Sequence, residues 1–320
     1  MFFHTAGIEV SPWIPPLVAF VISFFTSMGG ISGAFLLLPF QVSVLGYTNP
    51  SVSATNQLFN IVAIPSGVYR YCKEGRMVWP LAWVIVAGTL PGVFIGAFVR
   101  VKYLPDPKNF KLFAAFVLLY IGIRLIRDLL SKNSGKADKA LCEKNFQDIV
   151  RNHQIKTAQS EKKGCEAIPV VEVTHFNLKR LGYKFYGEQF DVSFRGIFSL
   201  SFIVGIVGGI YGIGGGAIIA PFLVTFFGLP VYTIAGAALM GTFITSVAGV
   251  AFYQAIAPFY PNMSVAPDWF LGILFGLGGM AGIYLGARCQ KYVPAKVIKW
   301  MLAGIITLTA LKYLAEFLGF

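Results

Sequence analysis

Charged side chains are scarce in this sequence. Only 12% of its 320 residues are Asp, Glu, Lys or Arg, about half of the roughly 25% typical of soluble proteins, while 56% are hydrophobic. This profile excludes a disordered chain, a disulfide scaffold and a nucleic-acid-binding domain, and it argues against a soluble enzyme. The composition therefore predicts a polytopic membrane protein in contact with lipid.

Histidine and cysteine are also rare, with three and four residues. No two cysteines have Cys-x-x-Cys spacing, so we expect free thiols in a reducing compartment. Cys142 and Cys165 with His153 and His175 are the candidate metal cluster, but their spacing matches no zinc pattern. No nucleophile, base and orienting residue recur together, and a membrane enzyme would need such a cluster in its loops. We expect no metal site, no cofactor and no catalytic residues.

Two long tracts contain no charged residue at all. They run from Val10 to Tyr69 and from Gly196 to Pro267. Because a spanning helix needs about 20 apolar residues, each tract holds several membrane segments. The residues between the tracts carry both signs of charge. We therefore divide the chain into a first membrane unit (1–130), a soluble linker (131–194) and a second membrane unit (195–320).

The two membrane units repeat one another. Gly30–Phe40 aligns without a gap with Gly212–Phe222, and Trp79 aligns with Trp269. Chance similarity between apolar helices rarely keeps Gly, Pro and Trp in register, so we infer two homologous repeats. Glycines at spacing four match as well: Gly88, Gly92 and Gly96 with Gly278, Gly282 and Gly286.

Each repeat begins with an apolar stretch that is too long for one spanning helix. Trp13–Leu45 and Gly196–Phe227 would each form a helix of about 50 Å, against a hydrocarbon core of about 30 Å. Their middles are rich in glycine. We predict two short half-helices joined by a non-helical glycine turn, which is tolerated at membrane depth where it is buried or lines a cavity. Three fuller spans follow in each repeat, at 50–69, 79–99 and 109–130 and at 231–256, 269–288 and 296–318.

The number of segments predicts their orientation. Five segments per repeat is an odd number, so the fold class is an all-α polytopic membrane protein with two inverted repeats. With the linker inside, the basic loops at 70–76 and 288–296 are also inside. The uncharged loop Pro258–Pro267 and both termini lie outside, and only the loop around Lys102 and Lys108 departs from the positive-inside rule. The N-terminus shows no signal peptide, and we expect the cytoplasmic (inner) membrane.

The linker is expected to be a small cytoplasmic domain. Its polar first part predicts a helix around Ala140–Arg151. Residues 168–194 alternate partly between apolar and polar side chains, and Gly182 and Gly187 would allow short hairpins. A β-structured cap between the repeats and a regulatory or partner-binding module both remain open.

The duplicated glycine turns are the candidate functional site. Glycine lets consecutive backbone N–H groups converge, and the helix after each turn begins with partial positive charge and unpaired N–H donors. Two such turns meeting near the midplane would bind an anion, as in inverted-repeat transporters with broken helices. Close helix packing is the alternative for the turns, and it is the preferred explanation for the glycines at spacing four.

Only neutral polar side chains accompany the turns, because the charge-free tracts exclude a carboxylate relay. Asn56 and Asn60 lie four residues apart on one helical face, and Thr242 matches Asn60 in the repeat. Helix-to-helix hydrogen bonding and substrate contact are both open for these residues. The predicted substrate-binding residues are Gly29, Gly30, Ser32, Gly33, Asn56, Asn60, Tyr211, Gly212, Gly214, Gly215, Gly216 and Thr242.

The sequence resembles the sulfite exporter TauE/SafE family in three features. These are the glycine-rich hairpins closing on Pro39 and Pro221, the paired Trp79 and Trp269, and the paired Gly-x-x-x-Gly-Ala runs. The resemblance covers nearly all of the chain outside 131–194. It implies a secondary transporter of sulfur-containing anions such as sulfite, thiosulfate or organosulfonates.

The sequence departs from the family pattern in two places. The first repeat has Ser32 and Ala34 where the second has Gly214 and Gly216, so its hairpin is expected to be narrower or to contribute the Ser32 hydroxyl. The linker is also longer than in the shorter members of the family.

Together these features predict alternating-access transport, with one half rocking against the other. The expected partners are a small sulfur oxyanion or sulfonate, held by N–H groups and neutral hydroxyls or amides rather than by a fixed arginine, and membrane lipid, without nucleic acid. Transport could be coupled to a protonatable substrate, to a proton or Na⁺, or to the membrane potential alone. The direction of transport, export or import, is also open, and so is the formation of a homodimer. A channel-like anion uniporter and a non-transport membrane subunit are the alternatives.

Overall fold

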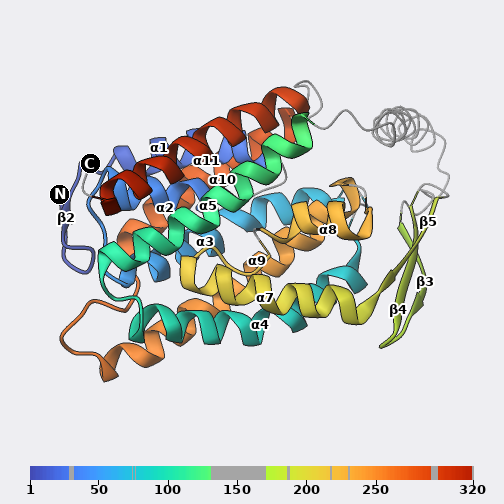
Figure 1. The fold of residues 1–320 in the computed structure, drawn as a ribbon, viewed down its shortest axis with the longest axis horizontal. Helices are drawn as coiled ribbons and strands as arrows, with labels where there is room; N and C mark the ends of the chain where they lie inside the picture. Colours follow the sequence, from blue (N-terminus) through green and yellow to red (C-terminus); the bar gives the residue numbers. More distant parts are fainter. Residues whose placement is uncertain are drawn as a thin grey trace.

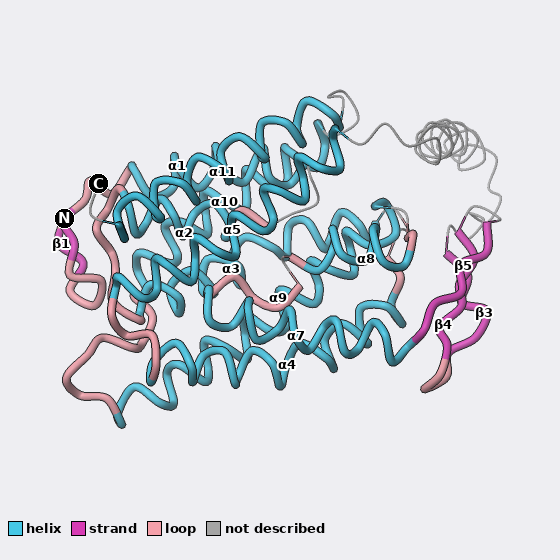
Figure 2. Tube along the Cα trace, in the orientation of Figure 1, coloured by secondary structure: helices cyan, strands magenta, loops and turns pink. Residues whose placement is uncertain are grey.

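The structure is a computed structural model, and it describes residues 1–28, 32–73, 75, 77–130, 171–185, 188–216, 218–229, 231–289 and 295–318. Helices lie side by side in a bundle, and a small sheet lies at one end of it (Figures 1 and 2). Both chain termini lie at the opposite end (Figure 1). The termini and the sheet of the linker thus lie at opposite ends of the bundle, as the odd number of segments predicts.

Within its described residues, the first membrane unit forms five helices: α1 (Ile14–Met28), α2 (Ala34–Ser43), α3 (Ser51–Lys73), α4 (Trp79–Lys102) and α5 (Pro107–Leu130). α1 and α2 are separate short helices, so the predicted break in the first apolar stretch is confirmed.

The described part of the second membrane unit forms α7 (Phe194–Tyr211), α8 (Ile219–Phe227), α9 (Val231–Ile256), α10 (Trp269–Cys289) and α11 (Ala295–Leu318), with a short 3-10 turn, η1 (Ala257–Phe259), after α9. α7 ends because Gly212 has φ +79°, a left-handed conformation that L side chains rarely adopt, and Gly214 follows with φ +76°. The second predicted break is therefore also confirmed.

Four described helical segments are long and apolar enough to cross a membrane: Trp79–Lys102, Phe194–Tyr211, Thr233–Phe259 and Trp269–Cys289. The six predicted full spans all correspond to helices, with ends that differ by a few residues. α7 was expected to be a short half-helix, but it is 18 residues long because the chain stays helical up to the left-handed Gly212. α1 and α2 are apolar but shorter.

The end of the linker is a three-stranded antiparallel sheet. β3 (Val171–Phe176), β4 (Arg180–Phe185) and β5 (Glu188–Ser193) pair in that order. The β-structure expected for residues 168–194 is thus confirmed. The helix expected around Ala140–Arg151 lies outside the described residues.

The glycines of this sheet do not both lie in turns. Gly187 lies outside the described residues, and the expectation that Gly182 permits a turn is wrong. Gly182 lies inside β4 opposite His175, where a side chain would collide with the imidazole. Tyr183 is fully buried, and its hydroxyl donates to Thr233 Oγ1 at 3.0 Å, so the sheet is fixed to the start of α9.

A smaller sheet at the N-terminus was not expected. β1 (Phe2–Phe3) pairs with β2 (Ile8–Glu9), and strands of two residues are too short to show an alternating pattern in the sequence. The Ala6 N–H between them donates to Asp268 Oδ2 at 3.3 Å. The N-terminus is thereby held against the start of α10.

Helices of opposite membrane units pack together through glycine. α4 lies on α7, and α1 lies on α10. A Cβ at Gly88 would lie 2.7 Å from the carbonyl oxygen of Phe198 in α7, and a Cβ at Gly278 would lie 2.6 Å from Cα of Pro16 in α1. We call these two backbone contacts, α4–α7 and α1–α10, the glycine seams. The packing explanation for the glycines at spacing four is confirmed.

Candidate functional site

The second glycine turn and the described end of the first, Ser32 and Gly33, meet on one face of α3. Asn56 and Asn60 lie one helical turn apart on that face, and both are fully buried. Asn56 Nδ2 donates to the carbonyl oxygen of Ala34 at 3.0 Å and to that of Gly212 at 3.1 Å. A single amide thus connects the start of α2 with the turn after α7.

Asn60 makes a second connection between the turns. Its Nδ2 donates to the carbonyl oxygen of Ile213 at 2.9 Å and to Ser246 Oγ at 3.3 Å. Its Oδ1 accepts from Ser32 Oγ at 2.5 Å. Of the two roles open for the asparagines, the structure shows the helix-to-helix hydrogen bonding. Asn56 Oδ1 is buried and has no partner among the described residues.

The second turn retains free backbone donors. Gly215 N–H donates to Thr245 Oγ1 at 3.2 Å. In the described part of the chain, the N–H groups of Gly214 and Gly216 make no hydrogen bond. The turn leads directly into the N-terminal end of α8, which carries partial positive charge. These two N–H groups are donors that an anion can use.

Tyr211 and Thr242 close the site from its sides. The Tyr211 hydroxyl donates to the carbonyl oxygen of Phe35 at 3.4 Å, and the two rings stack with centroids 6.1 Å apart. Thr242 Oγ1 donates to Ala238 O of its own helix at 2.8 Å, and a Cβ at Gly216 would lie 2.6 Å from that hydroxyl. The turn is therefore packed closely against α9, with glycine where no larger residue fits.

The structure brings together the predicted site residues that it describes: Ser32, Gly33, Asn56, Asn60, Tyr211, Gly212, Gly214, Gly215, Gly216 and Thr242. Gly29 and Gly30 lie outside the described residues. Of the four residues considered as a metal cluster, only His175 is described. In the described ranges, no three His, Cys, Asp or Glu side chains are grouped to hold a metal ion.

A buried cation near the second turn escaped the sequence analysis. Arg100, in the last turn of α4, is fully buried. Its Nε donates to Ser53 Oγ at 3.4 Å, and one terminal nitrogen donates to the carbonyl oxygen of Thr48 at 3.2 Å. The other terminal nitrogen donates to the carbonyl oxygen of Leu104, and the guanidinium carbon lies 3.8 Å from the centroid of the Phe110 ring.

Ser53 links Arg100 to the second turn. Ser53 Oγ donates to the carbonyl oxygen of Ile210 at 3.4 Å, and a Cβ at Gly212 would lie 2.6 Å from Ser53 Cβ. The signal that could have identified Arg100 is an arginine flanked by Val99 and Val101 in the last turn of an apolar helix. The predicted span ends at residue 99, because the charges that follow are typical of a loop.

Comparison with known proteins identifies the family. The family model of the sulfite exporter TauE/SafE proteins matches residues 16–313, which include both glycine turns and both seams. The chain belongs to the sulfite exporter TauE/SafE family. The resemblance inferred from the hairpins and the paired tryptophans is thus confirmed.

Two relatives of this TauE/SafE chain come from Bacillus subtilis (strain 168). The probable membrane transporter protein YunE is 20% identical over 300 residues, which are 91% of this chain and 92% of YunE. The probable membrane transporter protein YdhB is 27% identical over 118 residues, which are 37% of this chain and only 45% of YdhB. No solved structure matches the chain. The TauE/SafE family and both names indicate a membrane transporter, and the apolar helices support a multi-pass membrane protein.

Proposed function

We propose that the protein is a secondary transporter that moves a small sulfur-containing anion (sulfite, thiosulfate or an organosulfonate) across the membrane by alternating access. The observation that carries this proposal is the meeting of the second glycine turn with the described end of the first, at Ser32–Ala34, on one buried face of α3. Membership of the TauE/SafE family supports a sulfur-containing anion as the substrate.

In this proposal, the anion binds between the turns. The N–H groups of Gly214 and Gly216 supply donors, while Asn56 and Asn60 hold the turns in position. The hydroxyls of Ser32 and Thr242, which here donate to Asn60 and to Ala238, would have to rotate toward the anion to add theirs. Backbone N–H groups at a helix N-terminus favour negative charge without adding a formal charge. The full proposed set of site residues, which either contact the anion or position the turns around it, is Gly29, Gly30, Ser32, Gly33, Asn56, Asn60, Tyr211, Gly212, Gly214, Gly215, Gly216 and Thr242.

The glycine seams support inverted repeats. α1 occupies the place in the first repeat that α7 occupies in the second, and α4 corresponds in the same way to α10. The α1–α10 and α4–α7 contacts are therefore one type of contact made twice, with the repeats exchanged. Together with the positive-inside rule, this arrangement supports a linker on the cytoplasmic side of the inner membrane and both termini outside.

The seams also support a particular division into moving parts. Rocking one whole repeat against the other would break both seams, because each joins helices of opposite repeats through backbone contacts. We expect α1 to move with α10 and α4 to move with α7. The site lies between these two pairs, where Asn60 of α3 donates to Ser246 of α9.

Uptake of sulfite and thiosulfate into proteoliposomes containing only the purified protein tests the site. Gly214→Leu would crowd the second turn, where a Cβ would lie 2.8 Å from Ser246 Oγ, and Gly33→Leu would crowd the first, 3.2 Å from the Phe59 ring. Both are expected to abolish uptake. Gly304→Leu in α11 is the matched control, since nothing lies within 4 Å of a Cβ there. Uptake at the wild-type rate by folded turn variants would exclude the turns as the site.

The same vesicles distinguish the alternatives. Accumulation driven by an imposed proton or Na⁺ gradient supports coupled transport, whereas flux that follows only the membrane potential indicates a channel-like uniporter. The absence of flux with the purified protein would support a non-transport membrane subunit. Light scattering of the purified protein tests the proposed homodimer.

A further inference from the structure

We propose that Arg100 is the fixed positive charge that binds the transported anion on the side of the second turn nearer the chain termini. This inference rests on the proposed function, and it adds to the turns a residue with a formal charge. Its starting point is a fully buried guanidinium whose hydrogen-bond partners are all neutral.

Arg100 lacks a carboxylate partner in the described part of the chain. An arginine has five N–H donors, and Ser53, Thr48 and Leu104 occupy one each, which leaves two. Burying a charge without a counter-ion costs several kcal/mol, and charges at membrane depth are typically retained for function. Two free donors on a planar guanidinium fit the oxygen atoms of a small oxyanion.

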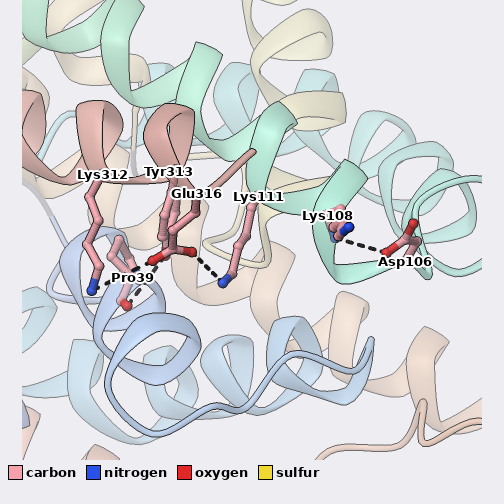
Figure 3. A network of polar contacts seen from close by, with 7 residues as sticks. All are labelled: Pro39, Asp106, Lys108, Lys111, Lys312, Tyr313 and Glu316. Carbon is pink, nitrogen blue, oxygen red and sulfur yellow. Dashed lines mark hydrogen bonds and ion pairs between the residues drawn. The ribbon is translucent and has the colours of Figure 1, made fainter. Parts of the chain in front are cut away.

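Three carboxylates at this end of the molecule have other partners, and Glu9 of β2 is exposed. Figure 3 shows Glu316 between Lys111 and Lys312, with 2.6 Å between Lys111 Nζ and Glu316 Oε2. In the same view, Asp106 Oδ1 accepts the backbone N–H of Lys108 at 2.9 Å (Figure 3).

The third carboxylate, Asp268, accepts the backbone N–H groups of Ala6 and Leu271 at 3.3 and 3.0 Å. Since none of the described acids pairs with Arg100, its charge remains available to a diffusible anion.

The position of Arg100 connects it to the turns. Ser53, Asn56 and Asn60 lie at i, i+3 and i+7, so they share one face of α3. Arg100 bonds to the first of these residues, and the glycine turns bond to the other two. An anion that leaves the second turn along this face therefore meets Arg100 next. The charge would attract the anion from the side of the termini and exclude cations from the same path.

A purely structural role makes a different prediction. Through Thr48 and Leu104, Arg100 also ties the loop before α3 to the loop after α4. If this tie were its function, its replacement would lower stability and leave substrate affinity unchanged.

The experiment compares Arg100→Gln and Arg100→Lys with Lys102→Gln. Lys102 is the matched control because it is an exposed cation in the same last turn of α4. Two quantities are measured: the KM for sulfite uptake into proteoliposomes, and the shift of Tm produced by sulfite, thiosulfate, sulfate or nitrate in detergent. Dimethyl sulfone serves as an uncharged probe. Tm without anion reports the structural contribution of each side chain.

In Arg100→Gln we expect the KM to rise by about tenfold or more and the anion-induced shift of Tm to disappear, since charge-assisted hydrogen bonds are lost. Arg100→Lys should show an intermediate KM, because it keeps the charge but loses the planar fork. Lys102→Gln should behave as the wild type. If Arg100→Gln fails to fold, Arg100→Lys tests the proposal alone, and its KM for sulfite must still exceed that of the wild type.

A wild-type KM in folded Arg100→Gln or in Arg100→Lys would overturn the proposal. Failure of the proposed function has a different signature. The wild type could move no sulfur anion and still be stabilised by nitrate or sulfate. If those anions do not stabilise Arg100→Gln, the anion site at Arg100 stands and only the proposal of a sulfur-anion substrate is wrong. If no anion stabilises the wild type, both proposals fail.

Discussion

The amide of Asn60 holds three segments of the chain at once. It donates to Ile213 of the second turn and to Ser246 of α9, and it accepts from Ser32 beside the first turn. All its donors are therefore used inside the protein. This pattern assigns the side chain to positioning the turns rather than to contacting the substrate.

Replacement of Asn60 by leucine, which has a similar volume, tests this assignment. We expect Asn60→Leu to lower the free energy of unfolding by roughly 1–3 kcal/mol, because buried oxygens lose their donors. The KM of the variant that remains folded should change little. Denaturation in detergent and uptake kinetics provide the two measurements. Asn109→Leu, at an exposed position of α5, is the control. A large rise in KM at unchanged stability would instead make Asn60 a substrate ligand.

At this scale, the sequence predicted the neutral residues of the candidate site but not the buried Arg100 beside them. The turn glycines and Asn60 were recognisable because they recur in the repeat or lie on one helical face. Arg100 was not recognisable, since a cation at the end of an apolar helix has the sequence signature of a loop charge. Only the tertiary structure, which places Phe110, Thr48 and Leu104 around it, makes it a buried group.

The glycine seams are the clearest feature at the scale of elements. Along α4–α7, a Cβ at Gly92 would lie 2.8 Å from the backbone nitrogen of Ile206. Along α1–α10, a Cβ at Gly282 would lie 3.0 Å from the backbone nitrogen of Phe24. Backbone atoms cannot move aside as a flexible side chain can, so each seam depends on glycine.

Leucine at a seam should separate the two helices. We expect Gly92→Leu and Gly282→Leu each to lower the free energy of unfolding by roughly 1–3 kcal/mol or more, as overpacking does in other protein interiors. Gly304→Leu, with open space around the Cβ, should leave the free energy of unfolding within about 0.5 kcal/mol of the wild-type value. Equal stability of the seam and control variants would show that the backbones do not touch.

The sequence predicted the elements better than their contacts. The helices and both breaks followed from apolar length and glycine content, because these are local properties. Glycines at spacing four predicted close approaches but did not name the partner helix, which depends on the tertiary arrangement. The same limit explains Gly182, which looked like a turn residue and instead lies beside His175 within the sheet.

At the scale of the whole molecule, each repeat is incomplete by itself. α1 and α4 of the first repeat pack on α10 and α7 of the second (Figure 1). A separate first repeat would expose to lipid the glycine face of α4 and the face of α1 on which the α10 glycines pack, without the backbone contacts that stabilise helix association in membranes.

Expression of the two repeats as separate chains tests this dependence. Residues 1–130 alone should fail to give a stable, monodisperse protein, and so should residues 195–320 alone. Co-expression of the two chains should yield a complex that co-purifies and unfolds at a Tm close to that of the intact protein. The control is the full chain cleaved within the linker after purification. Two independently stable repeats would contradict the packing described for the seams.

The α1–α10 seam also determines when the protein can finish folding. α1 is synthesised before the other described helices, whereas α10 is the ninth of the ten α-helices that the structure describes. α1 must therefore wait in the bilayer, with its seam face covered only by lipid or by an insertion chaperone, while the helices in between are synthesised. The α1–α10 seam can consequently form only after most of the described chain has been translated. Until then, the unpaired face of α1 is exposed to incorrect helix contacts.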